Sequence, residues 1–255
     1  MSFIISNVPF TDWIHHLKRN KKIVVVNNVD KASHEGGRLL PLSVYNYASF
    51  NKYHNNVFPN EMESVNVLDD KSRFAEFMMD HFPDHTPFVF YYNYDNIEYI
   101  SDTVPLTHQF ILKPNKGYAG AGIKIIDKLG DRKKHHVVQE YINHDMAYVG
   151  HFLVLKGRVL KKIYFYSHHT QNRIKRGPIR NYQTTETLTS DDSVFDNIFR
   201  HLNYSGFACP EFVIVDDRIV IFEINPRPGG SLIQNHHYLD LFIDCLDQHT
   251  SSVTE

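Results

Sequence analysis

Residues 222–231, "FEINPRPGGS", decide how the rest of the chain is interpreted. Glu223, Asn225 and Arg227 are spaced by two, so their side chains share one face of an extended strand. Two prolines and two glycines then end the strand. Carboxylate and amide oxygens are ligands that Mg²⁺ prefers, and a guanidinium group suits a phosphate or another oxyanion. The segment predicts either a binding site for metal and phosphate or a strand end whose polar side chains are solvated.

A second carboxylate precedes this segment on a neighbouring strand. Residues 211–225, "EFVIVDDRIVIFEIN", have the pattern of two strands joined by a turn at Asp216-Asp217. In such a hairpin Glu211 and Glu223 can face each other, and two close carboxylates repel unless a cation lies between them. The hairpin therefore predicts a metal site with Glu211, Glu223 and Asn225 as candidate ligands.

A glycine-rich loop joins two apolar strands at residues 111–126, "ILKPNKGYAGAGIKII". Gly117, Gly120 and Gly122 let the backbone bend and bring N–H groups close to an anion. Lys113, at the end of the first strand, is placed to neutralise phosphate oxygens. Because no helix opens directly after the loop, it is neither a Walker motif nor a dinucleotide motif. A flexible hairpin with a solvated lysine has the same pattern, so both interpretations stay open.

Residues 137–145, "VVQEYINHD", begin as an apolar strand and become polar at its end. An adenine ring needs an apolar slot with a backbone donor and acceptor at its edge, and a strand end of this kind supplies both. Gln139, Glu140, Tyr141 and Ile142 are the candidate residues. A strand that simply leaves the sheet is the alternative.

The order of these motifs resembles that of the ATP-grasp superfamily from about residue 69 to residue 235. "DDKSRFAEFM" resembles the D-K opening of the family, which would make Lys71 the first nucleotide lysine and Lys113 the second. "VVQEYI" is similar to the adenine hinge, and Asp145 is the nearest acid for the ribose position. The resemblance also implies that the 211–225 hairpin holds Mg²⁺ and that Arg227 lies near the transferring phosphoryl group.

The resemblance implies an α+β fold in which two α+β subdomains grip ATP. The expected organisation is a shortened N-terminal α/β segment at 1–68 and an ATP-grasp domain at 69–255, with a small lid subdomain at about 103–140. The order of the predicted elements agrees, because strands and helices do not alternate regularly as they do in a Rossmann sheet.

The resemblance implies an enzyme that uses ATP and two Mg²⁺ ions, for which Mn²⁺ could substitute. A carboxylate would be phosphorylated to an acyl phosphate and then joined to an amine, with release of ADP and phosphate. Lys113 and Arg227 are the candidate catalytic residues, because they would hold the oxygens of the transferring group. Two alternatives stay open: a small-molecule kinase, since "QEYINHD" resembles the hinge of inositol phosphate kinases, and a nucleotide-binding module without turnover.

A basic segment at residues 168–185 is a candidate for binding the acceptor substrate. It holds four cations, Arg173, Lys175, Arg176 and Arg180, within eight residues. Such a cluster suits a carboxylate or phosphate group, and we predict Arg176 and Arg180 as substrate-binding residues. A solvated basic loop is the alternative.

Composition and charge narrow the possible classes of protein. The 255 residues are 42% hydrophobic and 22% charged with a net charge of −2, so no general attraction to nucleic acid or anionic membranes is expected. Two cysteines form no disulfide framework, and no apolar run is long enough to span a membrane, which predicts a cytoplasmic protein. Adjacent histidine pairs favour surface histidines over a zinc site. The expected partners are small carboxylate and amine substrates; the oligomeric state is not indicated.

The hydrophobic pattern predicts further elements. Helices are expected within 10–20, from Asp70 to Pro83, from 192 to Gly206 and at about 232–247. Strands are expected at 22–29, at 88–92 and along most of 110–166, with a hairpin turn at Lys156-Gly157.

Overall fold

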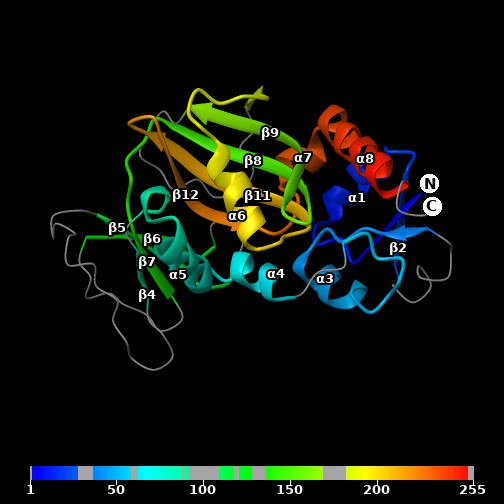
Figure 1. Ribbon diagram of the computed structural model, residues 1–255, viewed down its shortest axis with the longest axis horizontal. Helices are drawn as coiled ribbons and strands as arrows, with labels where there is room; N and C mark the ends of the chain where they lie inside the picture. The colour runs from blue at the N-terminus through cyan, green and yellow to red at the C-terminus, as the bar shows by residue number, and fades with distance from the viewer. Residues whose placement is uncertain are drawn as a thin grey trace.

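The computed structural model describes residues 2–27, 37–58, 62–87, 89–91, 109–117, 121–127, 136–168 and 182–251. Three β-sheets lie in a row (Figure 1), with the N-terminal sheet at one end, a five-stranded sheet in the middle and a four-stranded sheet at the other end. Helices lie against these sheets, so the prediction of an α+β protein is confirmed.

The central sheet has the strand order β10-β9-β8-β11-β12 and is antiparallel throughout. Its strands are β8 (Met146–Leu155), β9 (Arg158–His168), β10 (Gln183–Thr185), β11 (Gly206–Val215) and β12 (Arg218–Asn225). Both predicted hairpin turns are confirmed. Lys156 and Gly157 have φ angles of 49° and 73°, and Asp216 and Asp217 have φ angles of 49° and 59°. Positive φ at both turn positions suits the right-handed twist of the flanking strands.

The four-stranded sheet has the order β4-β7-β5-β6 and is also antiparallel. Its strands are β4 (Val89–Tyr91), β5 (Phe110–Pro114), β6 (Lys124–Ile126) and β7 (His136–Glu140). Among the described residues, it has a small core of its own that consists of Phe110, Leu112, Ile126 and Val138. β4 belongs to this sheet although it precedes the range of about 103–140 predicted for the lid.

The N-terminal sheet is parallel, with the order β2-β1-β3. Its elements are β1 (Phe3–Ser6), α1 (Thr11–Leu17), β2 (Ile23–Val26), β3 (Arg38–Leu39) and α3 (Val44–Phe50). The sequence did not predict α3, which begins at Ser43, whose side chain accepts a hydrogen bond from the backbone N–H of Asn46. Phe3 and Tyr47 belong to the same core as Phe207 of the central sheet. This unit therefore does not form a core separate from the rest of the protein.

Two helices connect the N-terminal unit to the other sheets. They are α4 (Met62–Asp69) and α5 (Lys71–His81), followed by the short 3₁₀ helix η1 (Pro83–His85). Asp70 caps α5, because its side chain accepts hydrogen bonds from the backbone N–H groups of Ser72 and Arg73. The cap directs Lys71 from the first turn of α5 toward the central sheet, where it reaches Glu223.

Three helices cover the central sheet and the N-terminal unit. They are α6 (Ser193–His201), α7 (Gly230–Gln234) and α8 (His236–Ser251). α6 lies across one face of the central sheet (Figure 1) and ends at His201, five residues before the predicted stop. The single helix predicted at 232–247 is wrong, because Asn235 has extended backbone angles and separates α7 from α8. Among the described residues, no helix is long and apolar enough to cross a membrane.

Candidate nucleotide and metal site

The candidate site begins at a β-bulge where β11 and β12 pair. Glu211 lies opposite Glu223, but Phe212 lies opposite Ile221, so Phe222 is an extra residue on β12. The Lys113 ammonium lies 5.4 Å from the centre of the Phe222 ring, and the Lys71 ammonium lies 3.2 Å from Glu223. The bulge thus brings two successive residues of β12 next to two lysines from elsewhere in the fold.

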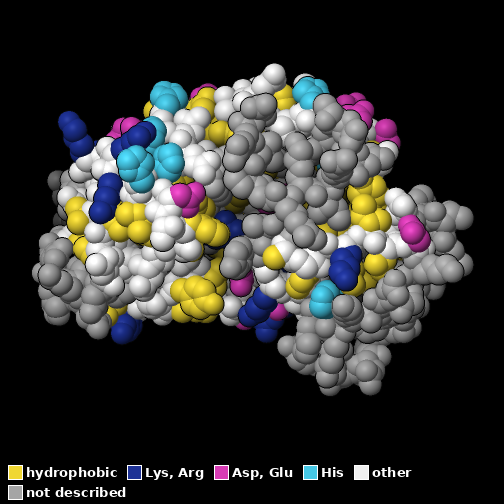
Figure 2. Space-filling view, turned by 180° about the vertical axis from the view of Figure 1, so that it is seen from behind, with side chains coloured by type: hydrophobic (Ala, Val, Ile, Leu, Met, Phe, Trp, Pro, Cys, Tyr) yellow, Lys and Arg dark blue, Asp and Glu magenta, His cyan; other side chains and the backbone are white. Residues whose placement is uncertain are grey.

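A chain of polar contacts runs along the end of β12. Lys71 Nζ contacts Glu223 Oε2 at 3.2 Å, and Asn225 Nδ2 donates to Glu223 Oε1 at 3.0 Å. Arg227 Nη2 in turn donates to Asn225 Oδ1 at 3.2 Å. The spacing by two therefore does bring Glu223, Asn225 and Arg227 together. Figure 2, which views the molecule from behind, shows acidic and basic side chains beside a hollow near its middle.

The four-stranded sheet contributes a buried lysine. Lys113, at the end of β5, is 7% exposed, and its ammonium donates to Gln139 Oε1 on β7 at 2.5 Å. Burial lowers the pKa of Lys113, and the charge of Lys71 lowers it further, whereas Glu223 opposes the shift. A lysine in this environment has a strong preference for an anionic partner, because an added negative charge would offset the cost of burying its own charge.

The two paired carboxylates have opposite electrostatic environments. The pKa of Glu211 is raised to about 7, first because protein surrounds the carboxylate, although it stays accessible from one side, and second because Glu223 faces it. Burial alone would also raise the pKa of Glu223, but the charges of Lys71 and Lys113 and the hydrogen bond from Asn225 lower it to about 2. Glu223 is therefore the permanent anion of the pair, and Glu211 is the carboxylate that a bound cation would ionise.

The donor set at the bulge fits Mg²⁺. Glu211 and Glu223 supply carboxylate oxygens from adjacent strands. The amide oxygen of Asn225, two residues farther along, accepts a hydrogen bond from Arg227 here, so it would have to turn toward Glu223 to join them. The Lys71 ammonium already contacts Glu223, which shows that this position accepts a positive charge. Among the described residues, no three His, Cys, Asp or Glu side chains form a group that could hold a metal, so the amide is needed to complete the set.

The structure describes the two ends of the glycine-rich loop, up to Gly117 and from residue 121. Gly122 has a φ of +78°, and a Cβ there would lie 2.8 Å from a Pro114 ring carbon, so this position requires glycine. At Gly117 a Cβ would meet only ordinary contacts. The backbone N–H of Lys71 donates to the Asn115 carbonyl at 3.1 Å, which ties α5 to the strand that leads into the loop.

The predicted hinge follows β7, but part of its backbone is already engaged. The Tyr141 N–H donates to the Gln109 carbonyl, and the Ile142 carbonyl accepts a hydrogen bond from His144 Nδ1. Gln139 points to Lys113, while Glu140, the last residue of β7, is partly exposed. Asp145, the residue predicted for ribose, is exposed just before β8.

Several predicted residues lie outside the described part of the chain. These are Gly120 of the glycine-rich loop and the four cations of the basic segment, Arg173, Lys175, Arg176 and Arg180. Their predicted roles stay predictions.

Three residues at the site were missed by the sequence analysis. Asp69, the last residue of α4, lies close enough to Lys116, Lys71 and Arg227 for their charges to act on it, although burial still raises its pKa. His151 on β8 is fully buried and bonds to Ser231, which follows the Gly-Gly turn. A lone histidine within the apolar run "YVGHFLVL" was the available signal for His151.

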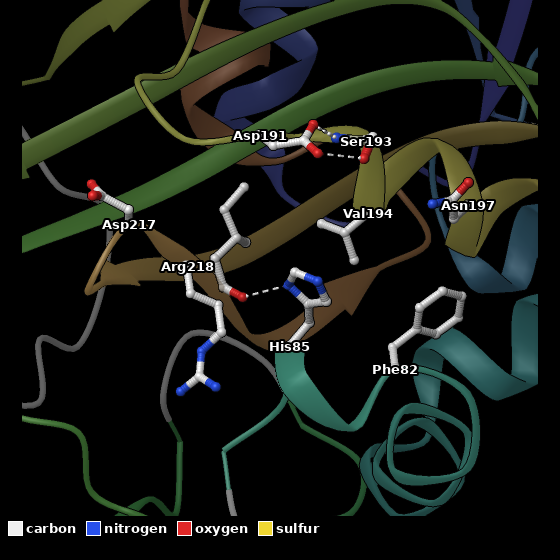
Figure 3. Close-up of a pocket in the computed structure, with 9 residues that line it drawn as sticks. Phe82, His85, Asp191, Ser193, Val194, Asn197, Asp217 and Arg218 are labelled. Atoms are coloured by element: carbon white, nitrogen blue, oxygen red, sulfur yellow. Dashed lines mark hydrogen bonds between the residues drawn. The ribbon is translucent and has the colours of Figure 1, made fainter.

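A cavity of about 200 Å³ lies elsewhere, between η1, α6 and the turn that joins β11 to β12 (Figure 3). Several of its polar groups already have structural roles. Asp191 accepts hydrogen bonds from the backbone N–H and hydroxyl of Ser193, and His85 Nδ1 donates to the Ile219 carbonyl. None of the nine residues that line it is among those predicted to bind nucleotide or metal. The candidate site is therefore the one at the bulge.

Paired carboxylates on one sheet, with Lys113 of the other sheet and Lys71 of α5 beside them, define a class of α+β proteins suited to hold a polyphosphate and a metal. The ATP-grasp domain family matches residues 68–231, and the chain belongs to this family. The prediction of an ATP-grasp fold is thereby confirmed. No curated protein shows a significant match to the sequence.

Several solved structures share the fold. D-alanine–D-alanine ligase from Bacillus anthracis, complexed with ATP, has a TM-score of 0.63 and 15% identity over 99% of this chain and 97% of that chain. L-amino acid ligase from Bacillus licheniformis has a TM-score of 0.54 and 15% identity over 96% and 74% of the two chains. Phosphoribosylamine–glycine ligase from Thermotoga maritima has a TM-score of 0.60 and 13% identity over 97% and 76%.

Proposed function

We propose that the protein is an ATP- and Mg²⁺-dependent ligase that activates a carboxylate as an acyl phosphate and joins it to an amine. The observation that carries the proposal is the continuous polar chain from Lys71 through Glu223 and Asn225 to Arg227, with Glu211 paired across the strands. A protein that only binds nucleotide has no physical need of two facing carboxylates, whose repulsion costs stability. The ligase names of the similar structures favour this reaction over others of the fold.

Each side chain has a role that follows from its position. Lys71 and Lys113 would bind phosphate oxygens of ATP from opposite sides, since one contacts Glu223 and the other lies above Phe222. Glu211, Glu223 and Asn225 would hold Mg²⁺, which when bound offsets negative charge on the phosphates. Arg227, at the far end of the chain of contacts, would hold the oxygens of the transferring group.

The reaction places few demands on acid–base chemistry by the protein. A carboxylate oxygen of the acid attacks the terminal phosphorus of ATP, and the bond to ADP breaks. The amine then attacks the acyl carbon, phosphate leaves, and the amine loses a proton. The residues of the site would contribute mainly by orienting the reactants and stabilising charge. The proposed location is the cytoplasm, and the expected partners are small carboxylates and amines.

The test exploits hydroxylamine, a small amine that intercepts acyl phosphates. The purified protein is incubated with ATP, Mg²⁺, hydroxylamine and a panel of carboxylic acids that includes amino acids, and hydroxamate and free phosphate are both assayed. We expect one class of acid to yield the two products in equal amounts. If a polyol or inositol phosphate instead gains a stable phosphate without release of free phosphate, the protein is a kinase. If no compound supports turnover although ATP binds, it is a binding module.

A further inference from the structure

The residue that the sequence analysis missed on β8 has an unusual environment. His151 is fully buried, and its Nε2 lies 2.8 Å from Ser231 Oγ. Its other ring nitrogen, Nδ1, is buried and has no hydrogen-bond partner among the residues that the structure describes. Such an atom is rare in a protein interior and calls for a specific explanation.

The surroundings of the two ring nitrogens indicate which of them carries the proton. A buried N–H without an acceptor is costlier than a bare ring nitrogen, so the proton belongs on Nε2. Burial lowers the pKa of His151 to about 3, and the positive charge of Arg227 acts in the same direction, so the ring stays neutral. Nε2 then donates to Ser231 Oγ, and the Ser231 hydroxyl is free to donate elsewhere.

The ring also packs directly under the turn that follows Arg227. A Cβ at Gly229 would lie 2.6 Å from His151 Cε1 and 2.7 Å from Cys209 Sγ, so the glycine backbone rests against both side chains. On its other side the ring meets Phe165 edge to face, with centroids 5.2 Å apart. His151 is thus held between the central sheet and the turn, with contacts to the turn at Gly229 and Ser231.

We propose that His151 is a positioning residue, whose neutral ring supports the turn at residues 226–231 and thereby holds Arg227 where the transferring phosphoryl group would lie. The inference rests on the proposed phosphoryl transfer. The guanidinium of Arg227 contacts the Pro228 carbonyl within this turn and Asn225 Oδ1 at the end of β12, just before the turn. Loss of the support would let the turn shift without disturbing Lys71 or Lys113, which belong to other elements.

The experiment compares the affinity for ADP with that for ADP plus aluminium fluoride, a mimic of the transferring group, both with Mg²⁺. The wild-type protein should bind the mimic more tightly than ADP alone. His151→Phe keeps an aromatic ring but removes both nitrogens. We expect the ratio of the affinity for the mimic to that for ADP to fall at least about tenfold, while the affinity for ADP itself changes by less than about twofold. Ser231→Ala should give the same loss, and the double variant should lose no more than either single variant.

Two further variants separate positioning from general stability. Phe165→Leu disturbs the packing of the ring from its other side and leaves the Ser231 bond in place, so it should lower the melting temperature but keep the gain. His151→Gln retains a donor for Ser231 and should recover part of the gain. The inference is overturned if His151→Phe binds the mimic more tightly than ADP by the same factor as the wild type. If His151→Phe does not fold, the same result in Ser231→Ala overturns it. Absence of any gain in the wild-type protein would instead overturn the proposed phosphoryl transfer, and the role of His151 with it.

Discussion

The five-stranded and four-stranded sheets both contribute side chains to the site but differ in how they are stabilised. The central sheet belongs to the large core that runs from Phe3 to Leu246, whereas the core of the four-stranded sheet comprises four of the described residues. A separate small apolar contact, between Ala75 of α5 and Val137 of β7, joins the four-stranded sheet to the rest of the protein. We therefore expect the carboxylates to lie in the more stable part of the molecule and Lys113 in a part that opens separately.

This difference explains how the two sides of the site can have separate tasks. Glu211 and Glu223 repel each other, so they need a scaffold that keeps them opposite each other without a cation. In the proposed function Lys113 and the hinge would let nucleotide enter and leave, which suits a sheet whose described residues share little apolar packing with the rest of the protein.

The largest effect is expected on the central sheet. Glu223→Gln keeps the size of the side chain but removes the charge that Lys71 contacts and that Mg²⁺ would need. We expect turnover with the acid identified by the hydroxylamine screen to fall about 100- to 1000-fold, as when a preorganised charged contact is lost from an active site. Asp217→Asn, which removes an exposed carboxylate from the turn of the same hairpin, is the matched control. Normal activity of Glu223→Gln at low Mg²⁺ would exclude the metal role.

A smaller effect is expected for the lysines on the two sides of the site. Lys71→Ala and Lys113→Ala should each weaken ATP binding by about 1.5–3 kcal/mol, the range for loss of a hydrogen bond to a charged group. Calorimetry measures the affinity directly. Lys124→Ala, at an exposed position on β6 of the same sheet as Lys113, serves as control and should leave the affinity unchanged. If all three variants bind ATP as tightly as the wild type, neither Lys71 nor Lys113 contacts the nucleotide.

A matched pair of core substitutions tests whether the sheets unfold separately. Ile126→Val and Ile224→Val delete the same methyl group from the small core and the large core, at a cost of about 0.5–1.5 kcal/mol each. Ile224→Val should lower the midpoint of global unfolding. Ile126→Val should leave that midpoint nearly unchanged and instead speed hydrogen exchange in β5 and β7. Identical effects of the two substitutions on global unfolding would show that the sheets form one cooperative unit.

The smallest effect concerns the pH dependence of the protein without nucleotide or metal. Because the pKa of Glu211 is raised from 4.5 to about 7, the folded state binds more protons than the unfolded state between these values. The Glu211 contribution to stability is therefore present below about pH 4.5 and is lost as the pH rises through 7. Denaturant unfolding in the presence of EDTA should show Glu211→Gln gaining stability relative to the wild type from pH 5 to pH 8. A constant difference across this range would contradict the raised pKa.

Much of the site could be predicted because its spacing is local. The period of two along a strand places Glu223, Asn225 and Arg227 on one face, and the Asp216-Asp217 turn sets Glu211 opposite Glu223. These features depend on residues only a few positions apart.

The parts that could not be predicted depend on contacts between distant segments. The bulge at Phe222 is a property of pairing between two strands, which the alternating pattern of one strand does not reveal. β4 joins the four-stranded sheet through pairing with β7, about 50 residues later. The bond between His151 and Ser231 joins residues 80 positions apart, so no local pattern reveals it.

Hydrogen–deuterium exchange with and without ATP and Mg²⁺ tests whether nucleotide binds between the two sheets. We predict slower exchange on both sides of the site, in residues 110–117 and 136–142 of the four-stranded sheet and in residues 211–227 of the central sheet. Exchange in α3, at Val44–Phe50, should not change. Slower exchange confined to one sheet, or located around the cavity between η1 and α6, would show that nucleotide does not bind between the two sheets.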